Sequence, residues 1–428
     1  MSGKLISPIR SSIRGLTVLA IVVLLIPTLG KGMVVVESSS GVESFTLYFL
    51  NGIVVYDSLI NDTLVLETPI NISLKDGFEQ KVVHVMQYNV AFNDAIGAYV
   101  FNATKGFIGF FLSRVELHSR HREQMYRSLM QALYNPKFTS TLRSIEVPEE
   151  VSSYLKSPCL KVVEVVKPKY EEWFKETYGY DVEYAGLLGI AATAAYFVQH
   201  VFIQYDPSGI PKSIDEVVDT RHGDCDDMSR VLVELLNTYN IPAVISVGYV
   251  YVSNFNFTMP IENVTYRYVN CGPHAFVMAY IPGEGWLSLD FLAFTLLTRP
   301  FICEGYGRET TVKEELVQEH LSLHRFLNAT QVMMILSEED LLKLLGGSLT
   351  LESVMKCFQD LVKIDSITSF DSIKEASSEH RDKEAGKVDV IMPEVGYIVI
   401  AAITILSLTL IIMFGRRLSK SAKDSTSS

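Results

Sequence analysis

The hydrophobic residues of this chain follow two different spacings, which divide it into a strand-rich first part and a helix-rich second part. From Met33 to about Phe111, short β-branched and aromatic runs such as Phe45–Leu50 and Ile53–Tyr56 are separated by Asn-Gly, Asp-Gly and Lys-Gly pairs. Such runs, punctuated by turn residues, predict β-strands. We therefore predict a β-rich domain over residues 33–112, with the layout of a sandwich and with no evident chemistry of its own.

Apolar residues recur at helical spacing from about residue 113 onward. The pattern predicts helices over residues 113–134, 147–157 and 168–179, and a strongly apolar, Ala-rich helix over Gly186–Val201 that should be buried. It predicts three more helices later in the chain, over residues 312–326, 337–345 and 350–363. We assign residues 113–345 to one domain, with its core at residues 185–300.

A strand pair joined by a tight turn is predicted inside that core. Ile245–Val252 is an apolar, aromatic strand, and Cys271–Ile281 has the composition of a strand buried on both faces. The Pro-Gly-Glu-Gly stretch that follows predicts a turn, and Trp286–Asp290 is the returning strand. A hairpin of this kind brings His274, on its first strand, within hydrogen-bonding reach of Asp290.

The most informative stretch surrounds Cys225, which lies at the start of a predicted helix. Gly223 supplies a flexible turn, and Asp224 is a good helix N-cap. Cys225 shares the inward face of this helix with an apolar stripe formed by Met228, Val231, Leu232, Leu235 and Leu236. The first turn of a helix favours the thiolate form of a cysteine. Three neighbouring carboxylates, Asp224, Asp226 and Asp227, oppose a further negative charge, so an imidazolium partner is required.

Three blocks around these residues resemble the core of the transglutaminase-like superfamily, whose fold is papain-like. They are Gly-Asp-Cys225 followed by a Leu-rich helix and Ile-Pro-Ala, then His274-Ala-aromatic, then Trp-x-x-Leu-Asp290, in the family's order. The upstream segment Phe202-Ile-Gln-Tyr205-Asp206 also resembles the residues that precede the family's cysteine block. The resemblance covers about residues 150–300. It implies an α+β fold in which the helix carrying the cysteine packs on an antiparallel sheet.

The resemblance also implies a role for each residue of the triad. Cys225 would be the nucleophile, His274 the general base and Asp290 the group that orients the imidazole. The chain departs from the family at three positions, where Gly, Arg and Trp are usual: Asn240, Val244 and Phe276. These departures leave the triad intact and the subfamily open. Besides the Cys225 backbone N–H, the sequence identifies no donor for an oxyanion, and it implies no cofactor.

The same residues allow other interpretations. A buried Cys, or a His on an apolar strand, is commonly structural. A metal ion could be bound by His222, Asp224, Cys225 and His274, but no second Cys or His has a standard zinc-ligand spacing, so we expect no metal site. The main hypothesis is a thiol enzyme acting on protein amide bonds, whose thioester is resolved by water or by an amine. The alternative is a cell-surface binding or structural module that keeps the fold without turnover.

Two apolar segments predict how the chain meets a membrane. Residues 16–26 follow three basic residues and end at Pro27, which is typical of a signal peptide or an N-terminal anchor over residues 1–32. Residues 396–414 carry no charge and are long enough to cross a bilayer as a helix. We therefore predict a transmembrane helix over residues 396–415.

Charges next to this helix predict its orientation. The tail over residues 416–428 contains Arg416, Arg417, Lys420 and Lys423, and positive residues stay on the cytoplasmic side. The chain before the helix, including a helix and a polar stalk over residues 346–395, is then outside. We expect a single-pass cell-membrane protein with an extracytoplasmic body that acts on protein or peptide substrates at the cell surface.

Glycosylation signals and cysteines agree with an outside, oxidising location. Six Asn-x-Ser/Thr sequons lie in the part predicted to be outside, at Asn61, Asn71, Asn102, Asn256, Asn263 and Asn328. If Cys225 stays free, the other four cysteines allow three pairings, of which we favour Cys271–Cys303; four buried thiols are the alternative. The formal net charge of −12 and the lack of a phosphate-binding Gly-rich loop argue against nucleic acid and nucleotide partners.

Overall fold

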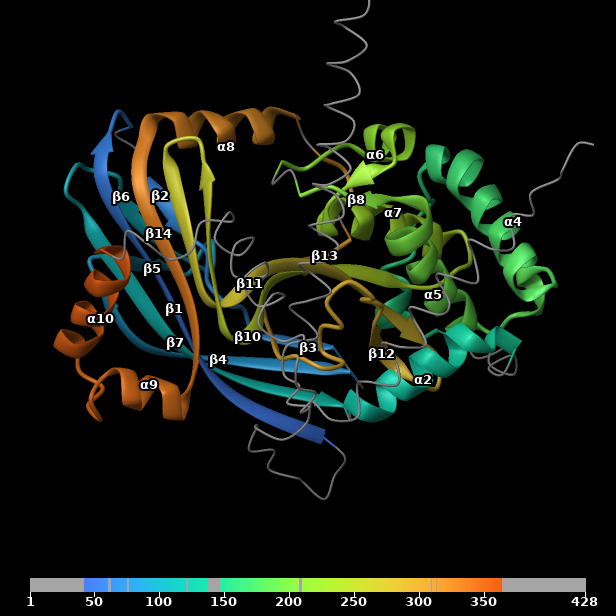
Figure 1. Cartoon of the computed structure of the whole chain (residues 1–428), viewed down its shortest axis with the longest axis horizontal. Helices are drawn as coiled ribbons and strands as arrows, with labels where there is room; N and C mark the ends of the chain where they lie inside the picture. Colours follow the sequence, from blue (N-terminus) through green and yellow to red (C-terminus); the bar gives the residue numbers. More distant parts are fainter. Residues whose placement is uncertain are drawn as a thin grey trace, which may run out of the picture. The chain divides into compact units, whose positions relative to one another are not determined.

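The chain folds around one large sheet, and its long first strand lies near the middle of that sheet. The computed structural model describes residues 42–363 except 61–62, 75–76, 121, 138–146, 208–209, 309 and 313. Strand β1 (Val42–Ser58) pairs antiparallel with β7 (Ile108–Arg120) on one side and with β14 (Leu327–Ser337) on the other. The chain's early and late parts therefore meet in one layer (Figure 1).

The sheet has nine strands and is mixed. Its order is β13-β10-β11-β14-β1-β7-β4-β3, with β12 paired to β11. The pairing of β11 with β14 is parallel, and the other pairings in this sheet are antiparallel. The remaining strands are β3 (Ile72–Leu74), β4 (Phe78–Tyr88), β10 (Ala243–Ile261), β11 (Val264–Ile281), β12 (Gly285–Ser288) and β13 (Phe301–Gly307).

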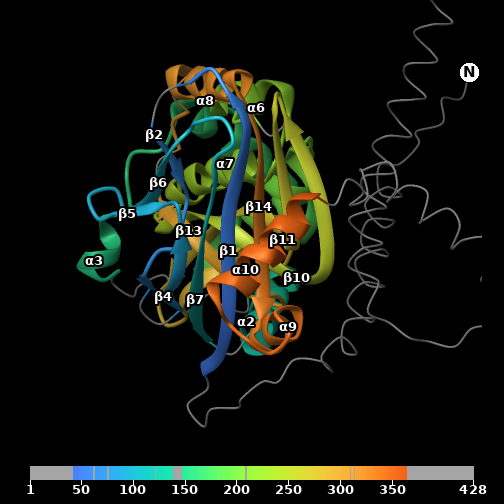
Figure 2. The same ribbon diagram turned by 90° about the vertical axis from the view of Figure 1, so that its left-hand side faces the viewer.

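Two separate groups of helices cover different strands of the sheet. The larger group lies around β10–β13, and the pair α9 and α10 lies over β1, β7 and β14 (Figures 1 and 2). The larger group comprises α2 (Arg122–Tyr134), α3 (Glu149–Ser152), α4 (Lys167–Tyr178), α5 (Leu187–Tyr196), α6 (Ile214–Thr220) and α7 (Cys225–Asn237). Two π-helical turns, η3 (Val162–Val166) and η5 (Phe197–Phe202), and a 3-10 turn, η4 (Val182–Tyr184), join them. The later helices are α8 (Glu314–Phe326), α9 (Glu338–Leu344) and α10 (Leu351–Lys363).

The two faces of the central strands are buried by different partners. On one face, Phe358 of α10 packs with Phe110 and other apolar side chains of β1, β7 and β14. On the other face, Phe111 stacks on Tyr99 of β6 (Ala98–Asn102), which forms a small sheet with β2 (Thr63–Leu66) and β5 (Ala91–Asn93). Successive residues of β7 point to opposite faces, so both layers are built from one strand.

Strands are present over residues 42–112, as far as the structure describes them, but among these strands only β2, β5 and β6 form a separate sheet. β1, β3, β4 and β7 belong to the sheet that carries the predicted site, and the described residues form one compact unit within residues 35–367. The early strands join this sheet because β1 pairs along one of its edges with β14, which lies nearly 300 residues later in the chain. Turn signals and local periodicity contain no information on such a distant pairing.

Secondary structure was predicted well for helices and less well for late strands. The helices predicted near residues 168–179, 186–201, 312–326, 337–345 and 350–363 are confirmed by α4, α5 with η5, α8, α9 and α10. The helix predicted from residue 113 begins only at Arg122, because Val115 and Leu117 alternate with polar residues as the end of β7. Strands β13 and β14 were not predicted.

The cysteine pairing favoured from the sequence is not formed. All five cysteines are free, and Cys271 and Cys303 lie on β11 and β13, with β10 between them. Strands two positions apart in a sheet are separated by about 9–10 Å. A disulfide spans at most about 7 Å between Cα atoms, so this pair cannot be bridged without breaking the sheet.

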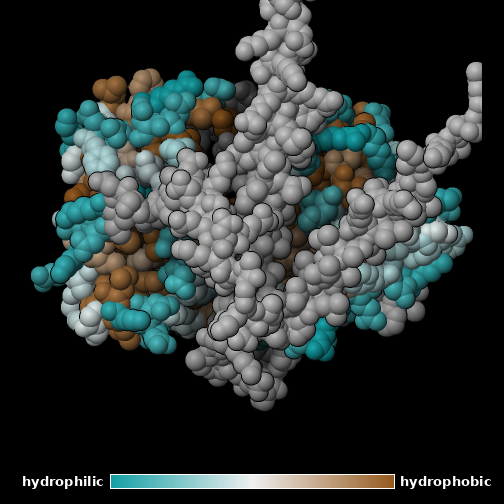
Figure 3. All heavy atoms as spheres, viewed as in Figure 1, coloured by the Kyte–Doolittle hydropathy of each residue, from teal (hydrophilic) through white to brown (hydrophobic). Residues whose placement is uncertain are grey.

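The predictions that concern the chain ends lie outside the described residues. These are the signal peptide or anchor over residues 1–32, the stalk beyond residue 363, the transmembrane helix over residues 396–415 and the basic tail. Among residues 42–363, as far as the structure describes them, no helix is long and apolar enough to cross a membrane. At the surface, hydrophobic residues gather over α9 and α10 (Figure 3), where exposed leucines include Leu342, Leu344 and Leu351.

Candidate active site

Helix α7 begins at Cys225 and is held at its start by a buried aspartate. The backbone N–H of Asp224 donates to Asp227 Oδ2 at 3.2 Å, and the Lys212 N–H donates to Asp227 Oδ1 at 2.9 Å. Asp227 is fully buried and also pairs with Arg230, one turn along the helix. Because a single carboxylate binds the N-cap, the preceding loop and the helix, the position of Cys225 is fixed by α7 itself and does not depend on a substrate.

The negative charge near Cys225 is smaller than the sequence suggests. Arg230 pairs with both Asp226, at 2.7 Å, and Asp227. Burial and the neighbouring Asp226 raise the pKa of Asp224 to about 8, so Asp224 is mostly protonated at neutral pH. Burial opposes ionisation of Asp226 as well, but its hydrogen bond from Asp224 and the charge of Arg230 lower its pKa below the usual value. Two of the three carboxylates, those of Asp226 and Asp227, are thus paired with one guanidinium.

His274 and Asp290 lie side by side, as the predicted hairpin requires. His274 Nε2 and Asp290 Oδ2 are 2.9 Å apart, with His274 on β11 and Asp290 just after β12. Asp290 is fully buried, and its oxygens also accept hydrogen bonds from three backbone N–H groups, those of Leu292, Ala293 and Thr295, at 3.0–3.1 Å. A carboxylate with this many donors is a stable anion and a fixed acceptor for the ring.

His274 and Asp290 each stabilise the charged form of the other. Burial alone would lower the pKa of His274, but the charge and hydrogen bond of Asp290, followed by those of Cys225, raise it to about 10. Burial alone would raise the pKa of Asp290, but the charge and hydrogen bond of His274 and the bond from Thr295 hold it well below its usual range. His274 is therefore an imidazolium at neutral pH, paired with an ionised Asp290.

Cys225 faces the same histidine ring. Its side chain lies near enough to His274 to be a further cause of the raised pKa of that histidine. Since Nε2 is used by Asp290, Nδ1 is the ring nitrogen left for the sulfur. The structure thus brings together the three residues predicted from the sequence: Cys225, His274 and Asp290. A positive ring beside a thiol stabilises the thiolate, the form that attacks a carbonyl carbon.

A buried glutamine that the sequence did not suggest holds the segment carrying Asp290. Gln199, on η5, donates through Nε2 to the Leu289 carbonyl at 3.1 Å and accepts from the Phe291 N–H at 2.8 Å. The neighbouring His200 bonds the Phe291 carbonyl at 3.2 Å. The chain is therefore clamped on both sides of Asp290. The sequence signal that could have identified Gln199 is its position as a polar residue within the strongly apolar run 186–201.

Two of the three departures from the family's usual residues, Phe276 and Val244, lie in the core. Phe276 is buried, its ring lies nearly parallel to that of His274 with 6.0 Å between ring centres, and it meets Phe301 edge-on. Val244, where Arg is usual, is fully buried. An aromatic wall beside the histidine is therefore kept although Trp is replaced.

The metal hypothesis is not supported by the arrangement of side chains. Among the described residues, the candidate cluster of ligands is Asp224, Asp226 and Asp227, and it includes neither His222 nor His274. The oxygens of Asp226 and Asp227 already bind Arg230 and backbone N–H groups. Arg230 occupies the place in which a cation would neutralise these carboxylates.

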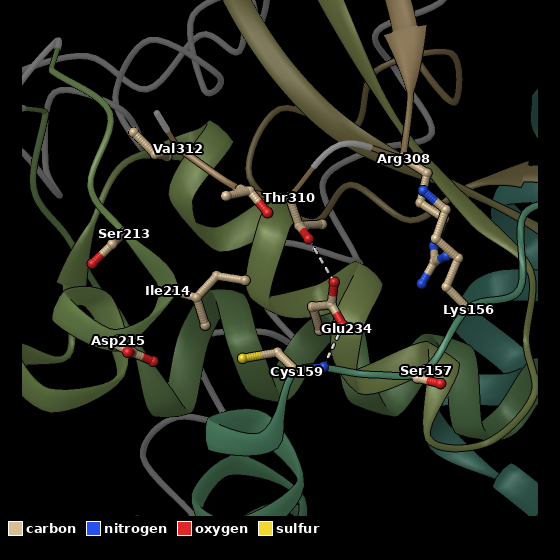
Figure 4. A pocket seen from close by; sticks show the side chains of 11 residues that line it. Lys156, Ser157, Cys159, Ser213, Ile214, Asp215, Glu234, Arg308, Thr310 and Val312 are labelled. Atoms are coloured by element: carbon tan, nitrogen blue, oxygen red, sulfur yellow. Dashed lines mark hydrogen bonds between the residues drawn. The ribbon is translucent and has the colours of Figure 1, made fainter. Parts of the chain in front are cut away.

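A cavity of about 400 Å³ lies beside α7 but does not contain the triad (Figure 4). At its base Glu234 accepts from the Cys159 N–H at 2.7 Å and from the Thr310 hydroxyl at 2.6 Å. Cys225 and Glu234 are nine residues apart, which places them on opposite faces of the helix. Glu234 thus ties two loops to the rear of α7, away from the nucleophile.

Part of the chain is similar to a known protein family. Residues 171–291 match the family model of the transglutaminase-like superfamily, a range that contains all three residues of the triad. No curated protein matches the chain. Among solved structures, the chain is similar to a candidate cysteine protease from Cytophaga hutchinsonii, with a TM-score of 0.36 and 12% identity over 69% of this chain and 93% of that chain. Residues 171–291 of this α+β chain are thus similar to a transglutaminase-like core.

Proposed function

We propose that the chain is a thiol enzyme that acts on protein amide bonds through Cys225, His274 and Asp290. The observation that carries the proposal is the hydrogen bond between the His274 ring and the buried Asp290 carboxylate, with the Cys225 side chain near the same ring. A nucleophile, a base and an orienting group in hydrogen-bond contact are what thiol acyl transfer needs.

The reaction would proceed in two steps. The Cys225 thiolate attacks the amide carbonyl carbon, the C–N bond breaks, and the leaving amine takes a proton from His274. The resulting thioester is resolved either by water, giving a peptidase or deamidase, or by a second amine, giving a transglutaminase. In both cases His274 removes the proton from the incoming nucleophile, and Asp290 keeps the ring in place.

The first test measures the reactivity of Cys225 by alkylation. Iodoacetamide at pH 5.5 should label Cys225 at least about tenfold faster than a model thiol, because the thiolate is kept beside the imidazolium. Cys225→Ala should remove this fast labelling, and Cys357→Ala, on α10, should keep it. Labelling of Cys225 at the rate of a model thiol would favour the non-catalytic binding module.

A second pair of assays separates the two enzymatic outcomes. Incorporation of dansylcadaverine into dimethylcasein reports transamidation, and fragmentation of the same casein reports peptidase activity. We expect one of the two signals to depend on Cys225. Wild-type protein that gives neither signal above the Cys225→Ala background would contradict an enzyme acting on protein amides.

We further propose that the body is extracytoplasmic and is anchored by residues 396–415. Five of the six sequons lie among the described residues, and four of their asparagines are exposed: Asn71, Asn102, Asn263 and Asn328. Exposed sequons are what glycosylation requires. The full chain should stay in the membrane pellet after carbonate extraction, and protease added outside intact cells should remove the body. Recovery in the soluble fraction would refute the anchor.

A further inference from the structure

Tyr205 is placed next to the nucleophile by a short parallel pairing of β8 (Gln204–Tyr205) with β9 (His222–Gly223). Its register partner is Gly223, two residues before Cys225. Hydrogen bonds fix both sides of the tyrosine: the Gln204 N–H donates to the Arg221 carbonyl at 2.8 Å, and the Asp206 N–H donates to the Gly223 carbonyl at 2.9 Å. The backbone of Tyr205 is therefore attached to the segment that starts α7.

The hydroxyl of Tyr205 lies among the charged groups of the site. Desolvation by the surrounding protein raises its pKa far above the ordinary value, followed by the charges of Cys225, Asp224, Asp226 and Asp290. The phenol is thus near both the nucleophile and the carboxylate of the triad, and it keeps its proton at any physiological pH. The residue is 37% exposed, so part of it is accessible from solvent.

Attack on a carbonyl creates a charge that the triad does not stabilise. As the S–C bond forms, the electron pair of the C=O π bond moves to oxygen and gives an oxyanion. The Cys225 N–H is available for it, because the first residues of a helix have no carbonyl partner within the helix. Acyl-transfer sites commonly supply two donors, and the second was not identifiable from the sequence.

We propose that Tyr205 is a further catalytic residue, whose hydroxyl donates the second hydrogen bond to this oxyanion. The proton stays on the phenol throughout, since collapse of the oxyanion re-forms the C=O bond and expels the amine with a proton from His274. The inference rests on the proposed role of Cys225 as nucleophile.

The test compares two reactions of Cys225 that differ in whether an oxyanion forms. Acylation by p-nitrophenyl acetate passes through an oxyanion and releases p-nitrophenolate, whereas alkylation by iodoacetamide displaces iodide from a saturated carbon. Tyr205→Phe in the full chain should slow acylation about 100-fold, the usual effect of removing one donor, and change alkylation by less than about twofold. The matched control, Tyr184→Phe at an exposed tyrosine, should change neither rate.

Three outcomes would overturn the inference. Equal acylation by wild type and Tyr205→Phe would show that the hydroxyl does not act on the oxyanion. Equal slowing of acylation and alkylation would assign Tyr205 to the state of the thiol instead. Wild-type acylation no faster than that of Cys225→Ala would refute the proposed function itself. If Tyr205→Phe does not fold, 3-fluorotyrosine at position 205, a stronger donor, should accelerate acylation at pH 6, and an unchanged rate would equally overturn the inference.

Discussion

Two regions of the central sheet are built by opposite means. Around α10, the sheet is covered by apolar side chains, with Phe358 fully buried against Phe110. We call this the α10 cluster. Around α7, the same sheet buries ionised groups, including Asp227 and Asp290, each with several hydrogen-bond donors. We call this the triad region.

The α10 cluster serves to stabilise the sheet, whereas the triad region serves to position charged groups. Apolar packing is non-directional and tolerates changes of similar volume, so the α10 cluster can hold the sheet together without precise angles. A buried charge is tolerated only with its partners in place, so the triad region depends on exact distances and loses its role when one partner is removed. We therefore expect substitutions in the two regions to affect different measurements.

The largest effect is expected for the triad. His274→Gln and Asp290→Asn should each lower the rate of Cys225 acylation by about 10³-fold or more, because the ring no longer holds the thiolate or is no longer oriented. Single-turnover acylation by p-nitrophenyl acetate measures this rate. Asp94→Asn, at an exposed aspartate, is the matched control. A loss of less than tenfold in both triad variants would show that the sulfur reacts without them.

The opposite behaviour is expected in the α10 cluster. Phe358→Ala should lower the free energy of unfolding by about 3–5 kcal/mol, through lost burial and the cavity left behind. Its acylation rate per folded molecule should stay within twofold, because Phe358 contacts none of the triad residues. Urea unfolding measures the first quantity, with the exposed Leu351→Ala as control. A parallel loss of acylation rate would show that the two regions are coupled.

Substitution of Gln199 should affect both stability and the acylation rate, because this buried polar residue holds the segment that carries Asp290. Gln199→Leu should cost about 1–3 kcal/mol of stability, because the Leu289 carbonyl and the Phe291 N–H lose their partners. It should also slow acylation about tenfold by loosening the segment around Asp290. Gln131→Leu, exposed on α2, should do neither. Unchanged acylation in a destabilised Gln199→Leu would limit the clamp to folding.

The smallest effect is expected when the free energy of unfolding is measured as a function of pH. The pKa of His274 rises on folding from 6.5 to about 10, so its contribution is complete below about pH 6.5 and is lost as the pH rises toward 10. The pKa of Asp290 falls on folding from 3.8, so its contribution is present above pH 3.8 and is lost at lower pH. The stability difference between wild type and His274→Gln, from urea unfolding, should therefore be largest between about pH 4 and 6.5. A difference that grows from pH 6.5 to 9 would contradict the assigned ion pair.

The sequence predicted the elements that carry Cys225, His274 and Asp290 better than it predicted the sheet around them. Nearby residues in the sequence determine where these elements begin and end. An N-cap precedes the helix that carries Cys225, and a Pro-Gly turn separates the strand of His274 from the strand that leads to Asp290. The neutral state of Asp224 and the clamp by Gln199 depend on groups brought from other elements, so no local pattern contains them. The same holds for β14, whose pairing with β1 and β11 determines its conformation more than its own composition does.

The pairing of β14 also limits how the protein can be divided. Residues 171–291 match the superfamily, yet β11, which carries His274, has β14 as a parallel neighbour, and β14 in turn needs β1. A fragment that stops after Asp290 would expose the backbone edge of β11, and one that starts after β7 would expose the edge of β14 that pairs with β1. Exposed edges of this kind recruit other chains. The smallest soluble, reactive piece should therefore run from β1 through α10, and during synthesis His274 would wait for more than 50 further residues before its sheet is complete.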